Sequence, residues 1–118
     1  MIRTYKNLEV YQKGYKLSLK IHKLTQKLPK FERYEIGSQM RRAAISIPAN
    51  IAEGYAKKQS TAEFKRFLLM SLGSCNEIQV FIEMCRDLNY IPKNLAKENL
   101  ESYEVLGKQL NTLQERWV

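Results

Sequence analysis

Apolar residues recur along the chain at intervals of three and four, the period of an α-helix that buries one face. The first series keeps an unbroken alternation of four and three: Val10, Gly14, Leu17, Ile21, Leu24 and Leu28. A regular seam of this kind is typical of helices that pack in bundles. We therefore predict a first helix over about residues 7–28, with Asn7 as its N-cap and Pro29 ending it.

A second apolar series predicts a helix from about Tyr34 to Gly54. Its members are Ile36, Met40, Ala43, Ile47, Ile51 and Gly54. Pro48 removes one backbone donor from the middle of this helix, and small residues around it allow another helix to approach closely. We expect both features to shape packing and to perform no chemistry.

A polar line runs beside this apolar stripe at the same spacing. It comprises Glu35, Gln39, Arg42, Ser46, Asn50 and Glu53. One interpretation is a buried hydrogen-bonded network that holds the helix to its neighbours, with Ser71, Ser74 and Glu77 as candidate partners. The other is a strip that contacts a second subunit or a ligand, and the sequence leaves both open.

Two further helices complete the pattern. Ser60 and Glu63 form a capping box at the start of a helix that extends to about Leu88, and another helix runs from about Lys93 to Arg116. Short connections between helices imply antiparallel neighbours. The expected fold is all-α, an antiparallel up-and-down four-helix bundle that forms a single domain over residues 1–118.

Three of the predicted helices carry apolar residues outside their main seams. These residues are Leu8, Tyr11, Tyr15 and Leu19 on the first helix, Ile45 on the second, and Leu69, Gly73, Val80 and Met84 on the third. A monomeric bundle needs one buried stripe per helix, so this surplus favours an oligomer interface. For the first helix, a wide core face is the alternative.

The charge of the chain is concentrated in its first half. The net charge is +8, and residues 1–66 carry 15 Lys and Arg against 5 Asp and Glu. This imbalance points to polyanionic partners. No run approaches the roughly 20 apolar residues that a membrane span needs, and the N-terminus lacks the apolar core of a signal peptide. We therefore expect a cytoplasmic protein without membrane contact.

Six lysines repeat at intervals of three and four along the first helix, about 110° around its axis from the apolar seam. This lysine row comprises Lys13, Lys16, Lys20, Lys23, Lys27 and Lys30. Lysines at helical spacing follow a phosphate backbone by charge alone, and Arg41 and Arg42 would add bidentate phosphate contacts. The alternative is an ordinary solvated helix face.

Nothing in the sequence predicts catalysis. His22 is the only histidine and has no carboxylate three or four residues away. Cys75 and Cys85 lie on the apolar face of one predicted helix, too far apart to form a disulfide, so we expect reduced core thiols. We therefore expect no enzymatic activity, no metal site and no cofactor.

The stretch from Gln39 to Gly54 resembles the signature of a known family, with Arg42, Ser46, Pro48, Asn50, Glu53 and Gly54 as its structural motif. The resemblance continues through Ser60, Glu63, Phe64, Phe67, Leu68, Gly73 and Ser74 to Glu77. The family is that of the four helix bundle proteins, also called 23S rRNA-intervening-sequence proteins or S23 ribosomal proteins. Its members are bacterial, and some are encoded inside insertions in 23S rRNA genes.

The resemblance implies a four-helix bundle and a homo-oligomer, with a ring of five subunits as the expected form. One relative of the family is the accessory protein of diversity-generating retroelements, a basic pentamer that binds a reverse transcriptase and nucleic acid. The function predicted for this chain is a non-enzymatic, basic, oligomeric protein that binds RNA or DNA, and a protein partner in addition is left open. The alternative is a structural or protein-interaction module without a nucleic-acid role.

Overall fold

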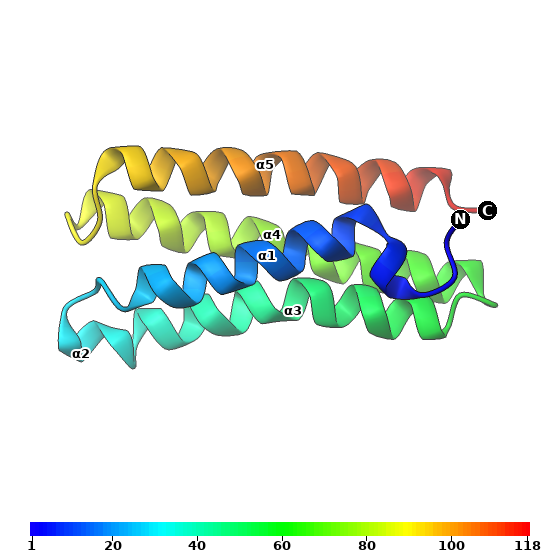
Figure 1. Cartoon of the computed structure of the whole chain (residues 1–118), viewed down its shortest axis with the longest axis horizontal. Helices are drawn as coiled ribbons and strands as arrows, with labels where there is room; N and C mark the ends of the chain where they lie inside the picture. Colours follow the sequence, from blue (N-terminus) through cyan, green and yellow to red (C-terminus); the bar gives the residue numbers. More distant parts are fainter.

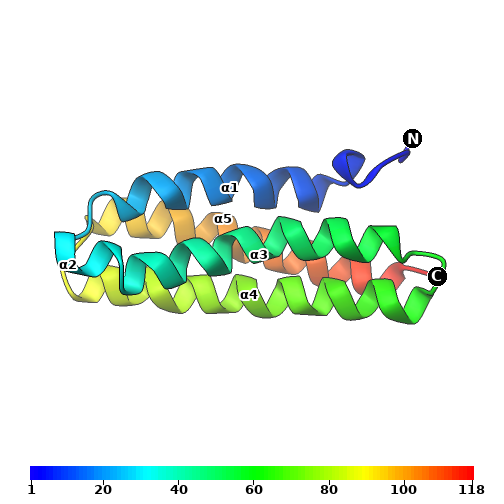
Figure 2. The ribbon, with the colours of Figure 1, turned by 90° about the horizontal axis from the view of Figure 1, so that it is seen from below.

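Four long helices lie side by side in a computed structural model that describes residues 1–118 (Figure 1). They are α1 (Glu9–Thr25), α3 (Ile36–Ala56), α4 (Thr61–Asp87) and α5 (Lys93–Arg116). A 3-10 turn, η1 (Tyr5–Asn7), precedes α1, and a short helix, α2 (Lys30–Arg33), connects α1 to α3. Consecutive long helices run antiparallel, so both termini lie at the end of the bundle opposite α2 (Figures 1 and 2). The predicted all-α four-helix bundle is confirmed.

The helix boundaries differ from the prediction mainly at both ends of α1. Thr4, rather than Asn7, provides the N-terminal cap, and it caps η1 instead of α1. Leu8 then takes an extended conformation, with φ −72° and ψ 127°, which separates the turn from the helix. At the other end, Leu28 N donates to Thr25 O at 3.3 Å, so the chain tightens into turns after Thr25 because Pro29 disfavours further α-helix.

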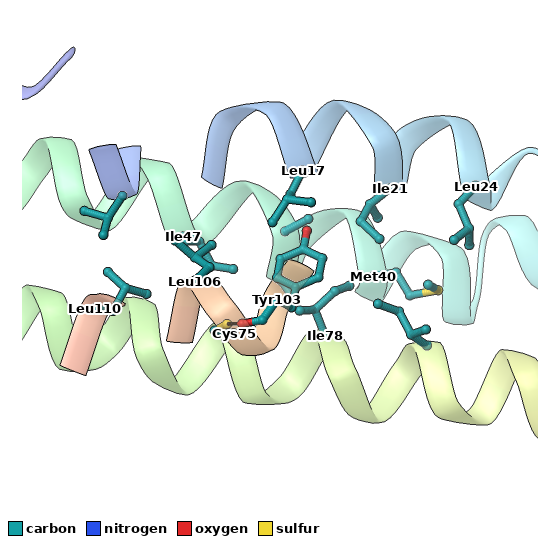
Figure 3. Close-up of a cluster of buried hydrophobic side chains, with 14 of the residues drawn as sticks. Leu17, Ile21, Leu24, Met40, Ile47, Cys75, Ile78, Tyr103, Leu106 and Leu110 are labelled. Carbon is teal, nitrogen blue, oxygen red and sulfur yellow. Dashed lines mark hydrogen bonds between the residues drawn. The ribbon is translucent and has the colours of Figure 1, made fainter. Parts of the chain in front are cut away.

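The predicted seams form the core (Figure 3). All six positions of the first series and all six of the second are buried. Leu8 is buried as well, at 3% exposure, so its assignment to an oligomer interface was wrong: it packs in the core of its own chain. No helix has both the length and the apolar character needed to cross a membrane.

Close approach of α1 to α3 depends on a glycine. A Cβ added at Gly14 would lie 3.1 Å from Cγ2 of Ile47 and 3.5 Å from Cδ of Pro48, so α1 rests almost directly on the middle of α3. The α3 helix continues unbroken through Pro48. Helix α4 packs on both α3 and α5, whereas contact between α1 and α5 is sparse.

The contact between α3 and α4 yields a prediction about Gly54. A Cβ at this position would lie 2.5 Å from Cβ of Phe67. Both of these atoms are bonded directly to the backbone, so neither can move without shifting its helix. We expect Gly54→Ala to lower the free energy of unfolding by about 1–3 kcal/mol, the usual cost of overpacking. Urea denaturation followed by circular dichroism measures this loss.

Gly107→Ala is the matched control, because its Cβ would meet Leu72 and Cys75 at 3.5 and 3.6 Å, which is ordinary contact. It should be neutral or gain about 0.5–1 kcal/mol from reduced backbone entropy in the unfolded chain. Equal effects of the two substitutions would contradict the close contact at Gly54.

The two cysteines are buried in the core and form no disulfide. Burial raises the pKa of both Cys75 and Cys85 from 9.0 to about 11. The Cys75 thiol also donates a hydrogen bond to the Tyr103 carbonyl at 3.0 Å. Both groups are therefore protonated and shielded in the native protein.

We predict that neither thiol reacts with Ellman's reagent at neutral pH until denaturant unfolds the chain. Rapid labelling of the native protein at neutral pH would contradict the burial of these side chains.

Folding also makes stability depend on pH, because it raises the pKa of both thiols. The thiols' contribution to stability is complete below about pH 9 and is lost as pH rises towards about pH 11.

Candidate nucleic-acid interface

The lysine row lies along a groove between α1 and α5. Lys13, Lys16 and Lys20 line a hollow of about 320 Å³ together with Ser102 and Val105 of α5. A second hollow, of about 170 Å³, follows along the groove, and its lining includes Lys20, Lys23 and Lys27 of α1 and the following turn, with Glu98 and Asn99 of α5. Five of the six lysines therefore share one channel on the surface.

Only two lysines of the row have carboxylate partners. Lys13 Nζ lies 3.3 Å from Oε1 of Glu9 on the same helix, and Lys20 Nζ lies 3.8 Å from Oε1 of Glu98 across the groove. Exposed ion pairs of this kind contribute only about 0–1 kcal/mol and are easily exchanged. Lys16, Lys23, Lys27 and Lys30 have no ion pair, so most of the positive charge along the groove is uncompensated.

The row is not a single straight helical face as predicted. Helix α1 ends at Thr25, so Lys27 lies in the following turn and Lys30 begins α2. Lys27 nevertheless lines the second hollow with Lys20 and Lys23. The helical spacing therefore holds from Lys13 to Lys23, and the turn continues the same surface for one more lysine.

The two predicted arginines lie apart from this groove. Arg41 is half-buried on the α3 side of α1, where Nη1 donates to Thr25 Oγ1 and Nη2 donates to the Arg33 carbonyl, both at 2.9 Å. Arg42 is exposed on another face of α3 and forms no hydrogen bond or ion pair with its side chain. Neither arginine extends the lysine row.

The residues predicted to form an oligomer interface fall into two groups, one on α1 and α3 and one on α4. Six of them are between 45% and 53% exposed: Tyr15, Leu19, Ile45, Leu69, Val80 and Met84. Tyr11 is half-buried and packs edge to face on Tyr5, with ring centroids 4.9 Å apart. Nothing lies within 4 Å of a Cβ added at Gly73, so this position of the exposed apolar group on α4 has no neighbour within the chain.

The polar line on α3 does not form the buried network that was one of its two interpretations. Ser46 Oγ donates to the Ala43 carbonyl at 2.7 Å, and Asn50 Nδ2 donates to the Ser46 carbonyl at 2.9 Å, so both side chains bond to their own helix. Ser71 of α4 does reach α3, but its hydroxyl donates to the Ile47 carbonyl at 2.9 Å. The remaining members, Glu35, Gln39, Arg42 and Glu53, are exposed.

Sequence reasoning missed the α5 side of the groove and a second polar hollow. Val105, an exposed apolar residue of α5, was a usable signal for the groove. The second hollow brings Arg33 and Tyr34 beside Arg41, and no periodicity in the sequence indicates that arrangement. No group of three metal-ligating side chains comes together anywhere in the chain.

Four long helices with a lysine-lined groove define this protein as a basic helical bundle. It belongs to the 23S rRNA-intervening sequence protein family, whose model matches residues 6–112. The chain is similar to a protein of unknown function from the S23 ribosomal protein family of Bacteroides thetaiotaomicron VPI-5482, whose crystal structure is known. The two share 24% sequence identity with a TM-score of 0.82, over 90% of this chain and 95% of that one. No curated protein matches the chain.

Proposed function

We propose that the protein is a non-enzymatic, oligomeric binding protein that holds RNA or DNA along the lysine row. The observation that carries this proposal is the groove between α1 and α5, in which five lysines converge and three of them lack a carboxylate partner. Lysines gathered on one surface repel one another, and a bound polyanion would offset that repulsion.

The groove favours contact with the phosphate backbone over reading of bases. Lysine is a compact charge on a flexible stem, and such contacts position a strand without carrying sequence information. Lys23 follows Lys13 by ten residues, which is about 15 Å of helix, given a rise of 1.5 Å per residue. That length accommodates only a few phosphates, so a single subunit would bind weakly.

Oligomerisation, which we propose as well, compensates for weak single contacts. The exposed apolar residues of α1, α3 and α4 offer two faces that a second copy of the chain would cover. Identical subunits would repeat the lysine row, so that one long polymer engages several rows at once and gains avidity. The resemblance described above favours a ring of five.

The same apolar faces also favour the second candidate function, a protein-interaction module without a nucleic-acid role. In that case the two apolar faces, one on α1 and α3 and one on α4, would bind a different protein, and the lysines would be a solvated surface. The salt dependence of binding separates the two functions, because phosphate contacts weaken steeply with salt while apolar contacts do not.

Changing Lys16, Lys20 and Lys23 together to glutamate tests the proposed groove. We expect most of the affinity for labelled RNA or DNA to be lost, as measured by fluorescence anisotropy at two salt concentrations. The thermal melt should change little, because these side chains are exposed and only Lys20 forms an ion pair. Parent affinity should not depend on base sequence.

The matched control replaces Lys58, Lys93 and Lys97 with glutamate, which alters the net charge equally at exposed positions outside the groove. This control should retain most of the binding. Equal losses of affinity in both variants would show that binding depends on net charge and not on the groove. If the parent binds neither polymer at low salt, the protein-interaction module becomes the favoured function.

Light scattering coupled to size exclusion tests the oligomer. We expect a mass several times that of the 13.9 kDa chain, reduced towards the monomer by the double substitution Leu69→Glu and Val80→Glu. Phe31→Glu, an exposed apolar residue outside both faces, is the control and should leave the mass unchanged. A parent that elutes as a monomer at micromolar concentration would exclude this part of the proposal.

A further inference from the structure

A polar hollow lies near α2, which stands at one end of the bundle (Figure 1). Its α1 lining residues are not those that line the groove with the lysine row. Its volume is about 300 Å³, the lower end of the range for small-molecule sites. Its lining comes from the end of α1, from α2 and the residue after it, and from α3: His22, Thr25, Gln26, Arg33, Tyr34 and Arg41.

The guanidinium of Arg41 is fixed in place at this hollow. It donates from Nη1 to Thr25 Oγ1 and from Nη2 to the Arg33 carbonyl, both at 2.9 Å. Thr25 in turn donates to the His22 carbonyl at 3.0 Å. A Cβ at Gly37 would lie 3.2 Å from Nη1, so the absence of a side chain there makes room for the guanidinium.

Arg33 is held in a similar way, since its Nε donates to the Leu28 carbonyl at 3.1 Å. A guanidinium has five N–H donors, so each of the two arginines keeps at least three without a protein partner. Neither arginine forms an ion pair. The nearby Glu32 carboxylate instead accepts a hydrogen bond from the Tyr90 hydroxyl at 2.8 Å.

Two positioned guanidiniums without a counterion match the needs of a phosphate group, whose oxygens accept paired N–H donors. The hollow also presents an aromatic surface, because the Tyr34 side chain in its wall is 76% exposed. An exposed aromatic ring beside phosphate-binding arginines is the arrangement on which unpaired bases stack. A purely structural role for Arg41 would explain its bonds to Thr25 and Arg33, but not the exposed Tyr34 or the unused donors.

We propose that this hollow binds one nucleotide of a single-stranded segment, with the phosphate on Arg33 and Arg41 and the base against Tyr34. The partner class rests on the proposed function, but the site is separate from the lysine row and uses different side chains. The lysine row tracks charge, whereas the hollow would select unpaired over paired nucleotides, because a base within a duplex cannot stack on the ring.

The test titrates the ¹⁵N-labelled full chain with adenosine 5′-monophosphate, inorganic phosphate, adenosine and acetate in separate arms. We expect the monophosphate to shift the amide signals of residues 22–41 and to bind more tightly than phosphate, with adenosine and acetate weakest. Tyr34→Ala should reduce affinity for the monophosphate at least about fivefold and leave phosphate binding unchanged. The Tyr34 side chain is largely exposed and makes no hydrogen bond, so this variant should fold.

Arg33→Ala should weaken both phosphate ligands about tenfold or more, since it removes charge-assisted hydrogen bonds. Arg42→Ala is the matched control, because Arg42 is exposed and equally charged but does not line the hollow. It should bind the monophosphate as the parent does. Melting curves for each variant exclude unfolding as the cause of a loss.

Failure of this inference is distinguishable from failure of the proposed function. No shifts within residues 22–41 at saturating monophosphate would overturn the nucleotide site, whatever long RNA does. Equal binding of phosphate and monophosphate, with Tyr34→Ala neutral, would also overturn it. Binding of acetate as tight as that of phosphate would point to a carboxylate-binding surface for an acidic peptide and overturn the proposal. The triple lysine variant should bind the monophosphate normally while losing long RNA.

Discussion

Close packing of α1 on α3 is the constraint on which the rest of the structure depends. Gly14 lets α1 rest against Ile47 and Pro48, and this contact sets which flank of α1 faces α5. That flank carries lysines, and charged groups resist burial because they lose their hydration. Helix α5 therefore meets α1 only sparsely, and a groove remains between them. The groove is thus a consequence of packing on the opposite side of α1.

The parts of the fold that depend on burial could be predicted from the sequence, because a period of three and four directly reports a buried face. The α5 helix runs from Lys93 to Arg116 as predicted. Burial of Leu8 could not be predicted, since it depends on the break between η1 and α1, where Leu8 is extended. The role of Ser46 and Asn50 was also hidden, because such side chains can bond either across helices or to their own carbonyls at the same spacing.

Of the two candidate surfaces, the lysine row could be predicted from the sequence and the hollow around Arg41 could not. The lysine row follows from helical spacing, and its continuity past Thr25 survives because the turn keeps Lys27 beside Lys23. The hollow around Arg41 depends on how α2 folds back, and a helix of four residues leaves no periodic signal. Arg41 was recognised as a phosphate-binding candidate, but its neighbours Arg33 and Tyr34 come together only in the folded chain.

The last turn of α1 lies between the two surfaces. Lys23 faces the groove, while Thr25 supports Arg41 on the other side. Gln26, in the hollow wall, follows Lys23 by three residues, about 4.5 Å along a helix axis. A strand that leaves the lysine row at this end would pass over that turn within reach of the hollow. Binding at one surface would then raise the effective concentration at the other, so a polymer of several nucleotides would bind more tightly than either contact alone allows.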